Sequence, residues 1–192
     1  ALDNSSSISI MNTNVTNTNS DKDANVTGFF TRFNNKKNTH VYAANFKMSN
    51  EFFSDSTNTG FAGSISAAKN SGNYRYEVYT LFEDDKYNPN DLGFLYSNNE
   101  LTNGLNIGYE QLNENKNFIF SKYYLFVKHE KLFKENKFVN LEIEAETKFM
   151  FKNYLFFMTK IVADPYEKDD YYEARTGDFN TPVKRSKSKN KG

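Results

Sequence analysis

Hydrophobic and polar residues alternate one by one along much of this chain, most clearly in residues 137–151. One set of alternate positions there is mainly apolar: Val139, Leu141, Ile143, Ala145, Thr147, Phe149 and Phe151. The set between them is strongly polar: Asn140, Glu142, Glu144, Glu146 and Lys148. Successive side chains of a β-strand point to opposite sides, so this pattern predicts a strand with one apolar face and one charged face.

Similar segments recur along the chain, separated by Asn, Gly and Lys residues of the kind found in hairpin turns. Nine such segments can be delimited: residues 6–16, 25–33, 40–49, 60–68, 74–83, 101–112, 118–131, 137–151 and 154–162. Longer connections are expected at residues 53–59 and 84–100. The sequence therefore predicts an all-β chain, an antiparallel meander of about nine long strands with negligible helix.

Two architectures produce strands of this kind. In a soluble β-sandwich or small barrel the apolar face forms the core and the charged face meets water. In an outer-membrane-type β-barrel the apolar face meets lipid and the charged face lines the interior. Several segments are much longer than the ~5–6 residues usual in soluble sheets, and aromatic residues such as Phe52, Tyr123 and Phe149 lie near segment ends, as in an interfacial girdle. These features favour part of an outer-membrane-type β-barrel, with the soluble sandwich as the alternative.

Composition and charge narrow the function classes. Hydrophobic residues make up 38% of the chain, yet 17% is aromatic, which fits alternating strands better than a disordered chain. The 24 basic and 24 acidic residues balance, so electrostatics give no support for nucleic-acid binding. The chain has no cysteine, which excludes disulfides and thiolate metal sites.

The two ends of the chain differ from the strand-rich part. Residues 1–7 are expected to carry no signal-peptide features, and no run of ~18 apolar residues predicts a transmembrane helix. Residues 1–176 are expected to form the β-barrel segment. Residues 177–192, which end in Lys-Arg-Ser-Lys-Ser-Lys-Asn-Lys-Gly, are predicted to be a polar, basic, disordered tail.

Three stretches carry a resemblance to a known family. They are Met-Asn-Thr-Asn-Val-Thr at 11–16 with Asp-Ala-Asn-Val-Thr at 23–27, Asp-Asp-Lys-Tyr-Asn-Pro-Asn-Asp-Leu-Gly-Phe at 84–94, and Asp-Tyr-Tyr-Glu-Ala-Arg at 170–175. In these stretches the chain resembles the DUF5916 family of the Bacteroidota, over residues 6–175. The resemblance implies the C-terminal portion of larger proteins, an outer-membrane β-barrel region.

Two departures from the family pattern affect what the resemblance implies. The family-9-like carbohydrate-binding domain that such proteins often carry at their N-terminus has no counterpart in this sequence, so sugar binding does not carry over from it. The basic tail replaces further expected strands, which suggests a truncated or split product. An unclosed sheet in lipid would leave unpaired edges, so the remainder of a barrel or another chain is expected as a partner.

The most specific of the three motifs is the loop at 84–94, whose role the family label leaves unknown. Its candidate site residues are Asp84, Asp85, Asn90, Asp91, Leu92, Gly93 and Phe94. Carboxylate and amide oxygens at this density could bind Ca²⁺. The spacing matches no EF-hand, however, and Asp, Asn and Pro are ordinary turn residues, so no metal is expected.

Other candidates for chemistry have simpler explanations. Glu142, Glu144 and Glu146 could serve acid–base catalysis, but without a facing histidine they are interpreted as polar wall residues. His40 and His129 are far apart and lack a metal-ligand spacing. No nucleophile elbow or phosphate-binding glycine loop occurs. No catalytic residue and no cofactor are therefore expected.

The sequence thus leads to one main functional hypothesis and one alternative. The main hypothesis is a non-enzymatic segment of a β-barrel in the cell outer membrane, in contact with outer-membrane lipid. Its specific role is unknown: it is either passive or serves transport or surface display. The alternative is a soluble β-sandwich or barrel that binds carbohydrate through exposed aromatic residues.

Overall fold

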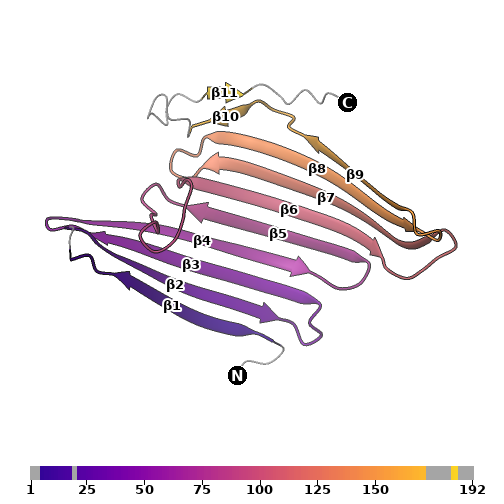
Figure 1. Cartoon of the computed structure of the whole chain (residues 1–192), viewed down its shortest axis with the longest axis horizontal. Helices are drawn as coiled ribbons and strands as arrows, with labels where there is room; N and C mark the ends of the chain where they lie inside the picture. The colour runs from indigo at the N-terminus through magenta and orange to yellow at the C-terminus, as the bar shows by residue number, and fades with distance from the viewer. Residues whose placement is uncertain (1–4, 19–20, 172–182, 186–192) are drawn as a thin grey trace.

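A computed structural model describes residues 5–18, 21–171 and 183–185 (Figure 1). Nine long strands follow one another: β1 (Ser7–Val15), β2 (Asp23–Asn34), β3 (His40–Phe52), β4 (Thr57–Lys69), β5 (Tyr74–Glu83), β6 (Glu100–Gln111), β7 (Phe118–Leu132), β8 (Phe138–Phe151) and β9 (Phe156–Ala163). They form one antiparallel sheet in which each strand pairs with the next in the sequence. The short strands β10 (Lys168–Asp170) and β11 (Val183–Arg185) form a separate antiparallel pair.

The predicted antiparallel meander of nine strands is confirmed, and no helix occurs in the part of the chain that the structure describes. One predicted connection is wrong. Residues 53–59 were expected to form a longer loop, whereas β3 and β4 meet in a tight turn in which Phe53 N donates to Ser56 O at 2.9 Å. The polar residues after this turn belong to β4, because they pair with β3: Thr59 Oγ1 donates to Asn50 Oδ1 at 2.8 Å.

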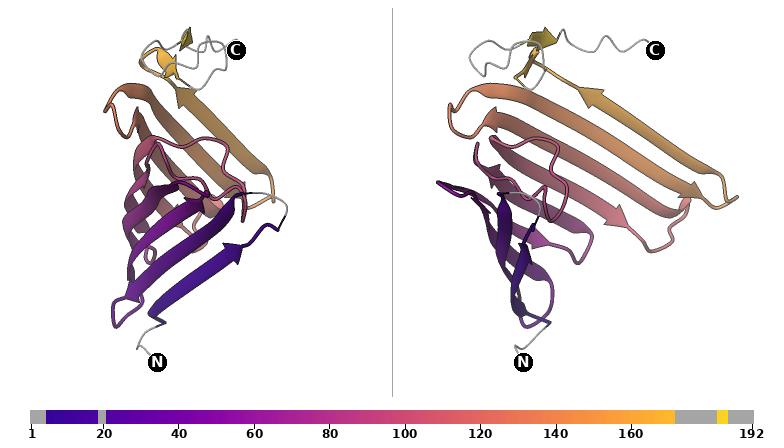
Figure 2. Two further views of the ribbon diagram at one scale, coloured as in Figure 1. Left: turned by 90° about the vertical axis from the view of Figure 1, so that its left-hand side faces the viewer. Right: turned by 60° about the vertical axis from the view of Figure 1, so that its left-hand side comes forward.

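The sheet is open and curved. β1 and β9 each pair with a single neighbour, and they do not pair with each other. Figure 2 shows the curvature of the sheet and the connection between β5 and β6, here called the 84–99 loop, on its inner side. The other six connections between β2 and β9 are short: residues 35–39, 53–56, 70–73, 112–117, 133–137 and 152–155.

The connections at the two edges of the sheet differ in length. The edge at which β2 ends and β3 begins carries the connections at 35–39, 70–73, 112–117 and 152–155, and it is called the short-turn edge below. The 84–99 loop leaves the opposite edge, beside the turn at 53–56. The described residues include no helix long and apolar enough to cross a membrane.

The buried apolar side chains of the sheet all lie on one face. Ala24, Val26, Val41, Ala62 and Leu132 are almost fully buried, and strand pairing places all of them on the inner face. Two of these five residues are alanines.

Glycines on the inner face are covered by aromatic rings of adjacent strands. Gly104 pairs with Tyr79, and a Cβ added at Gly104 would lie 2.0 Å from the Tyr79 ring. Gly108 pairs with Tyr124, whose ring would lie 2.9 Å from such a Cβ. Aromatic side chains that lie over cross-strand glycines help to fix the register of curved sheets.

Most of the predicted tail, residues 177–192, lies outside the described residues, as does most of the 170–175 motif. Within the tail the structure describes the backbone of β11, which pairs with β10. The prediction of a disordered tail therefore stays a prediction.

Candidate functional site

The apolar face of the sheet is exposed over most of its area. Strand pairing places the alternate apolar residues of β1–β9 on this one face. Its exposed large residues are Ile8, Ile10, Phe29, Phe33, Tyr42, Phe46, Phe52, Phe61, Ile65, Tyr74, Tyr76, Val78, Leu105, Ile107, Tyr123, Leu125, Phe157 and Ile161. The inner face exposes far fewer large apolar residues: Met11, Leu81, Phe156 and Met158. An uncovered apolar surface of this extent is typical of an interaction site.

Aromatic residues form a row across five adjacent strands near the short-turn edge of the apolar face. Ring centroids lie 4.9 Å apart for Tyr74 and Tyr109, 6.3 Å for Tyr109 and Tyr123, 5.5 Å for Tyr123 and Phe149, and 6.1 Å for Phe149 and Phe157. These distances fall in the range of favourable aromatic contacts. The row follows the edge of the sheet from β5 to β9.

Further aromatic pairs lie toward the opposite edge. The rings of Phe46 and Phe61 are stacked 5.6 Å apart, and those of Phe82 and Phe133 are stacked 5.4 Å apart. On β5 the apolar face is therefore bordered by aromatic residues, Tyr74 and Phe82, on both sides of Val78.

The inner face carries charged side chains that pair with one another. Arg75 lies 3.2 Å from the buried carboxylate of Glu110, which also accepts a 2.7 Å hydrogen bond from Tyr124 Oη. Glu144 pairs with Lys160 at 2.7 Å and Glu146 with Lys148 at 2.6 Å. Two of the three glutamates considered for acid–base chemistry are thus held in ion pairs along a polar wall.

The two histidines lie apart on the apolar face. The ring of His40 is 6.4 Å from that of Tyr76, whereas His129 is 5.9 Å from Phe138. Across the described residues, no group of three or more His, Asp or Glu side chains is arranged to hold a metal ion.

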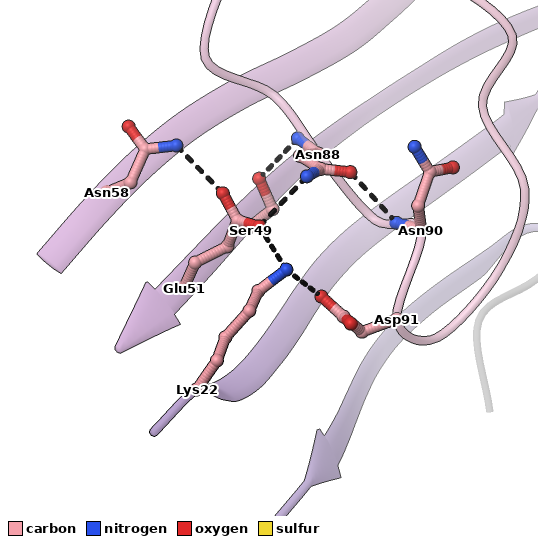
Figure 3. A network of polar contacts seen from close by, with 7 residues as sticks. All are labelled: Lys22, Ser49, Glu51, Asn58, Asn88, Asn90 and Asp91. Carbon is pink, nitrogen blue, oxygen red and sulfur yellow. Dashed lines mark hydrogen bonds and ion pairs between the residues drawn. The ribbon is translucent and has the colours of Figure 1, made fainter. Parts of the chain in front are cut away.

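The 84–99 loop folds onto the inner face above β3 and β4 (Figure 3). Asn88 N donates to Ser49 Oγ at 2.9 Å, and Asn88 Nδ2 donates to Glu51 Oε1 at 2.9 Å. Tyr87 is 3% exposed and packs where Gly60 leaves room: a Cβ at Gly60 would lie 2.2 Å from the backbone of Lys86 and Tyr87. The loop therefore depends on a glycine that is distant in sequence.

Glu51 is the centre of the polar network that holds the loop. Its carboxylate is buried and accepts hydrogen bonds from Asn58 Nδ2 at 2.9 Å and Asn88 Nδ2 at 2.9 Å, while Lys22 Nζ lies 2.6 Å from Oε1. Lys22 also pairs with Asp91 at 2.6 Å, so it links the β1–β2 connection to the loop. Hydrogen bonds to Asp91 and Glu51 raise the pKa of Lys22 above the ordinary lysine value of 10.5, which keeps it charged near neutral pH.

The far end of the loop is anchored by Asn99, which is fully buried. Its backbone N donates to Asp84 O at 3.1 Å, and its side chain accepts from Lys134 N at 2.9 Å and donates to Glu135 Oε2 at 2.8 Å. Its φ of 60° is a left-handed conformation that asparagine tolerates better than most residues.

The candidate motif residues have separate structural roles. Asp84 Oδ1 accepts from Lys86 N at 3.0 Å, Asp85 pairs with Lys134, and Asn90 Oδ1 accepts from Leu95 N at 2.6 Å. Leu92 N closes a turn onto Pro89 O at 2.8 Å. Asp91 joins the Glu51 network, whereas Gly93 lacks crowding and Phe94 is 85% exposed. The motif shapes and anchors a loop, and its members do not converge on one centre.

A polar pocket of about 410 Å³ lies between the loop and the sheet, lined in part by Asn58, Asn90 and Asn98. Tyr96, at its rim, is 90% exposed. Sequence reasoning missed Lys22, Ser49, Glu51 and Gly60, which hold the loop from other strands. The one available signal was the placement of Ser49 and Glu51 on alternate positions at the end of a strand.

The fold and the site define an up-and-down antiparallel sheet protein with an exposed apolar face and a loop anchored on its polar inner face. The family model described as "Domain of unknown function (DUF5916)" matches residues 1–191, so the chain belongs to this family. The match extends beyond the range 6–175 expected from the motifs and includes the tail. No curated protein and no solved structure matches the chain.

Proposed function

We propose that this chain forms part of the wall of an outer-membrane β-barrel, with its apolar face toward lipid and its polar face toward the barrel interior. The observation that carries the proposal is the exposed apolar face bordered by aromatic residues. In such barrels an apolar band ~25 Å tall lies between two aromatic girdles. Tyr74 and Phe82 stand at opposite borders of the face on β5, eight residues apart, or ~26 Å at ~3.3 Å per residue.

The polar face and the edges of the sheet support the same proposal. Ion pairs such as Arg75–Glu110 lie on the inner face, where the interior of a membrane barrel is polar. The edges at β1 and β9 are open, so further strands, from the same barrel or from another chain, would complete the wall. The 84–99 loop would lie inside the barrel and narrow its interior, which suits selective transport rather than a wide passage.

Cysteine labelling of the full chain tests the proposal directly. The chain has no native cysteine, so the labelling of each single-cysteine variant reports on one position alone. In vesicles, Leu141→Cys, Ile143→Cys and Ala145→Cys should react with a lipid-phase probe and resist a water-soluble thiol reagent. The matched variant Glu144→Cys, on the opposite face of the same strand, should show the reverse. Failure of the lipid-phase probe to label Ile143→Cys in folded protein would refute the lipid-facing assignment.

The soluble carbohydrate-binding sandwich stays the alternative prediction. In the described part of the chain the nine long strands form one sheet, and no second large sheet covers its apolar face. Cell fractionation separates the two proposals. A barrel wall should sediment with membranes and require detergent for extraction, whereas a sandwich should remain in the supernatant.

A further inference from the structure

A groove crosses the apolar face over β2–β5, near the short-turn edge. It has a volume of about 400 Å³, and its lining is almost wholly apolar. The small side chains Ala44 and Ala67 lie among the larger Phe33, Tyr42, Ile65 and Val78. The volume falls within the ~300–1,000 Å³ range of ligand pockets.

Three lysines lie in the turn and at the strand end next to this groove, on its short-turn side. Lys36 and Lys37 lie in the turn between β2 and β3, three and four residues after Phe33, and both are exposed. Lys69 follows Ala67 by two residues, so strand alternation places it on the same face. The turns at 35–39 and 70–73 contain no acidic residue that would neutralise these three lysines.

We propose that the groove and Lys36, Lys37 and Lys69 together bind one anionic phospholipid of the surrounding membrane. The acyl chain would lie along the strands from Lys69 toward Ile65, four residues or ~13 Å at ~3.3 Å per residue. The anionic headgroup would lie at the membrane surface among the lysines. This site rests on the proposed lipid-facing orientation, because only lipid that contacts the apolar face can reach it.

Photocross-linking with the full chain in vesicles tests the site. The probes are phosphatidylglycerol and phosphatidylcholine that carry the same photoreactive acyl chain, at equal concentration. Phosphatidylglycerol should label the 40–69 segment in preference to phosphatidylcholine. The triple variant Lys36→Gln/Lys37→Gln/Lys69→Gln should lose this preference, by about fivefold for each lysine removed. The control Lys116→Gln, an exposed lysine in another short turn, should retain it.

A second pair of variants tests the groove apart from its charge. Ala67→Leu should fill the groove and lower phosphatidylglycerol labelling, whereas Ala145→Leu, on the same face of β8, should leave labelling unchanged. Equal labelling by both lipids, or no response to the lysine variants, would overturn the site while leaving the barrel proposal intact. If inorganic phosphate alone abolished labelling by phosphatidylglycerol, the proposed site would also be overturned, because the groove would then contribute nothing to binding. If the chain does not insert into vesicles, both proposals fail together.

Discussion

Both faces of the sheet result from the same alternation of apolar and polar residues along the strands, but the two faces differ in what covers them. On the inner face Ala24, Val41 and Ala62 are nearly inaccessible, charged groups such as Arg75 and Glu110 form ion pairs, and a loop is anchored on β3. On the apolar face Ile65 is 64% exposed and Ile161 is 62% exposed. A soluble protein shows the opposite arrangement, with covered apolar residues and exposed charges. This inversion is the main physical support for the proposal that lipid lies beside the apolar face.

A charge placed on the apolar face should have the largest effect. Ile143 lies on β8 between the two aromatic borders, so Ile143→Arg should destabilise the folded chain in vesicles by ~2–4 kcal/mol. Glu144→Gln, one residue away on the inner face, removes only its ion pair with Lys160 and should cost ~0–1 kcal/mol. Urea titration in phospholipid vesicles measures both values. Equal costs for the two variants would contradict the assignment of the faces.

Crowding beneath the 84–99 loop should have the next largest effect. Gly60→Ala places a Cβ against the backbone of Lys86 and Tyr87, so the loop must shift, at ~1–3 kcal/mol. Gly93→Ala is the matched control within the loop, because its nearest new contact is Pro89 O at 3.8 Å, an ordinary van der Waals distance. Trypsin cleavage after Lys86 should accelerate in Gly60→Ala alone. Unchanged cleavage in that variant would show that the loop does not depend on this contact.

Loss of the Lys22 ion pairs should have the smallest effect. Lys22→Gln removes the link from Glu51 to Asp91 and should cost ~0.2–1 kcal/mol, since Lys22 and Asp91 are both partly exposed to solvent. The folded-state pKa of Lys22 is raised, so its contribution is complete below the ordinary value of 10.5 and is lost as the pH rises through the raised pKa.

The pH dependence of the unfolding free energy provides a control for the Lys22 prediction. The difference in unfolding free energy between the native chain and Lys22→Gln should be constant from pH 7 to 9 and should shrink above 10.5. The exposed Lys116, varied to Gln, should give no such difference at any pH. A difference that persists at pH 12 would assign the effect to packing of the lysine stem rather than to its charge.

The strands could be predicted because their signals are local. Alternation within one segment and Asn or Gly between segments determine β5 and β8 without reference to the rest of the chain. The start of β4 was missed because Asn58 is a poor strand former by itself and stands next to the polar Thr59. Their hydrogen bonds to Glu51 and Asn50 across the β3–β4 pair outweigh that preference.

The loop motif was found in the sequence, but its anchoring was not. Asn88 reaches Ser49 across 39 residues and Glu51 across 37, and no periodicity connects such positions. The requirement for glycine at position 60 depends on a loop that passes over it, which a single sequence does not reveal. Contacts of this kind depend on curvature of the whole sheet, whereas each strand depends only on its own residues.

The consecutive order of the nine strands also has a consequence for the rate and route of folding. Each strand finds its partner directly after a connecting segment, and the longest segment to be closed within the sheet is the 84–99 loop. The entropy lost on closing a loop grows only slowly with its length, so even this step adds little to the barrier. A meander of this kind has fewer distant pairings than a Greek-key sheet, and pairings between nearby residues favour fast folding. The chain can therefore assemble hairpin by hairpin from any point along its length, and strands added at β1 or β9 would extend an edge that is already formed.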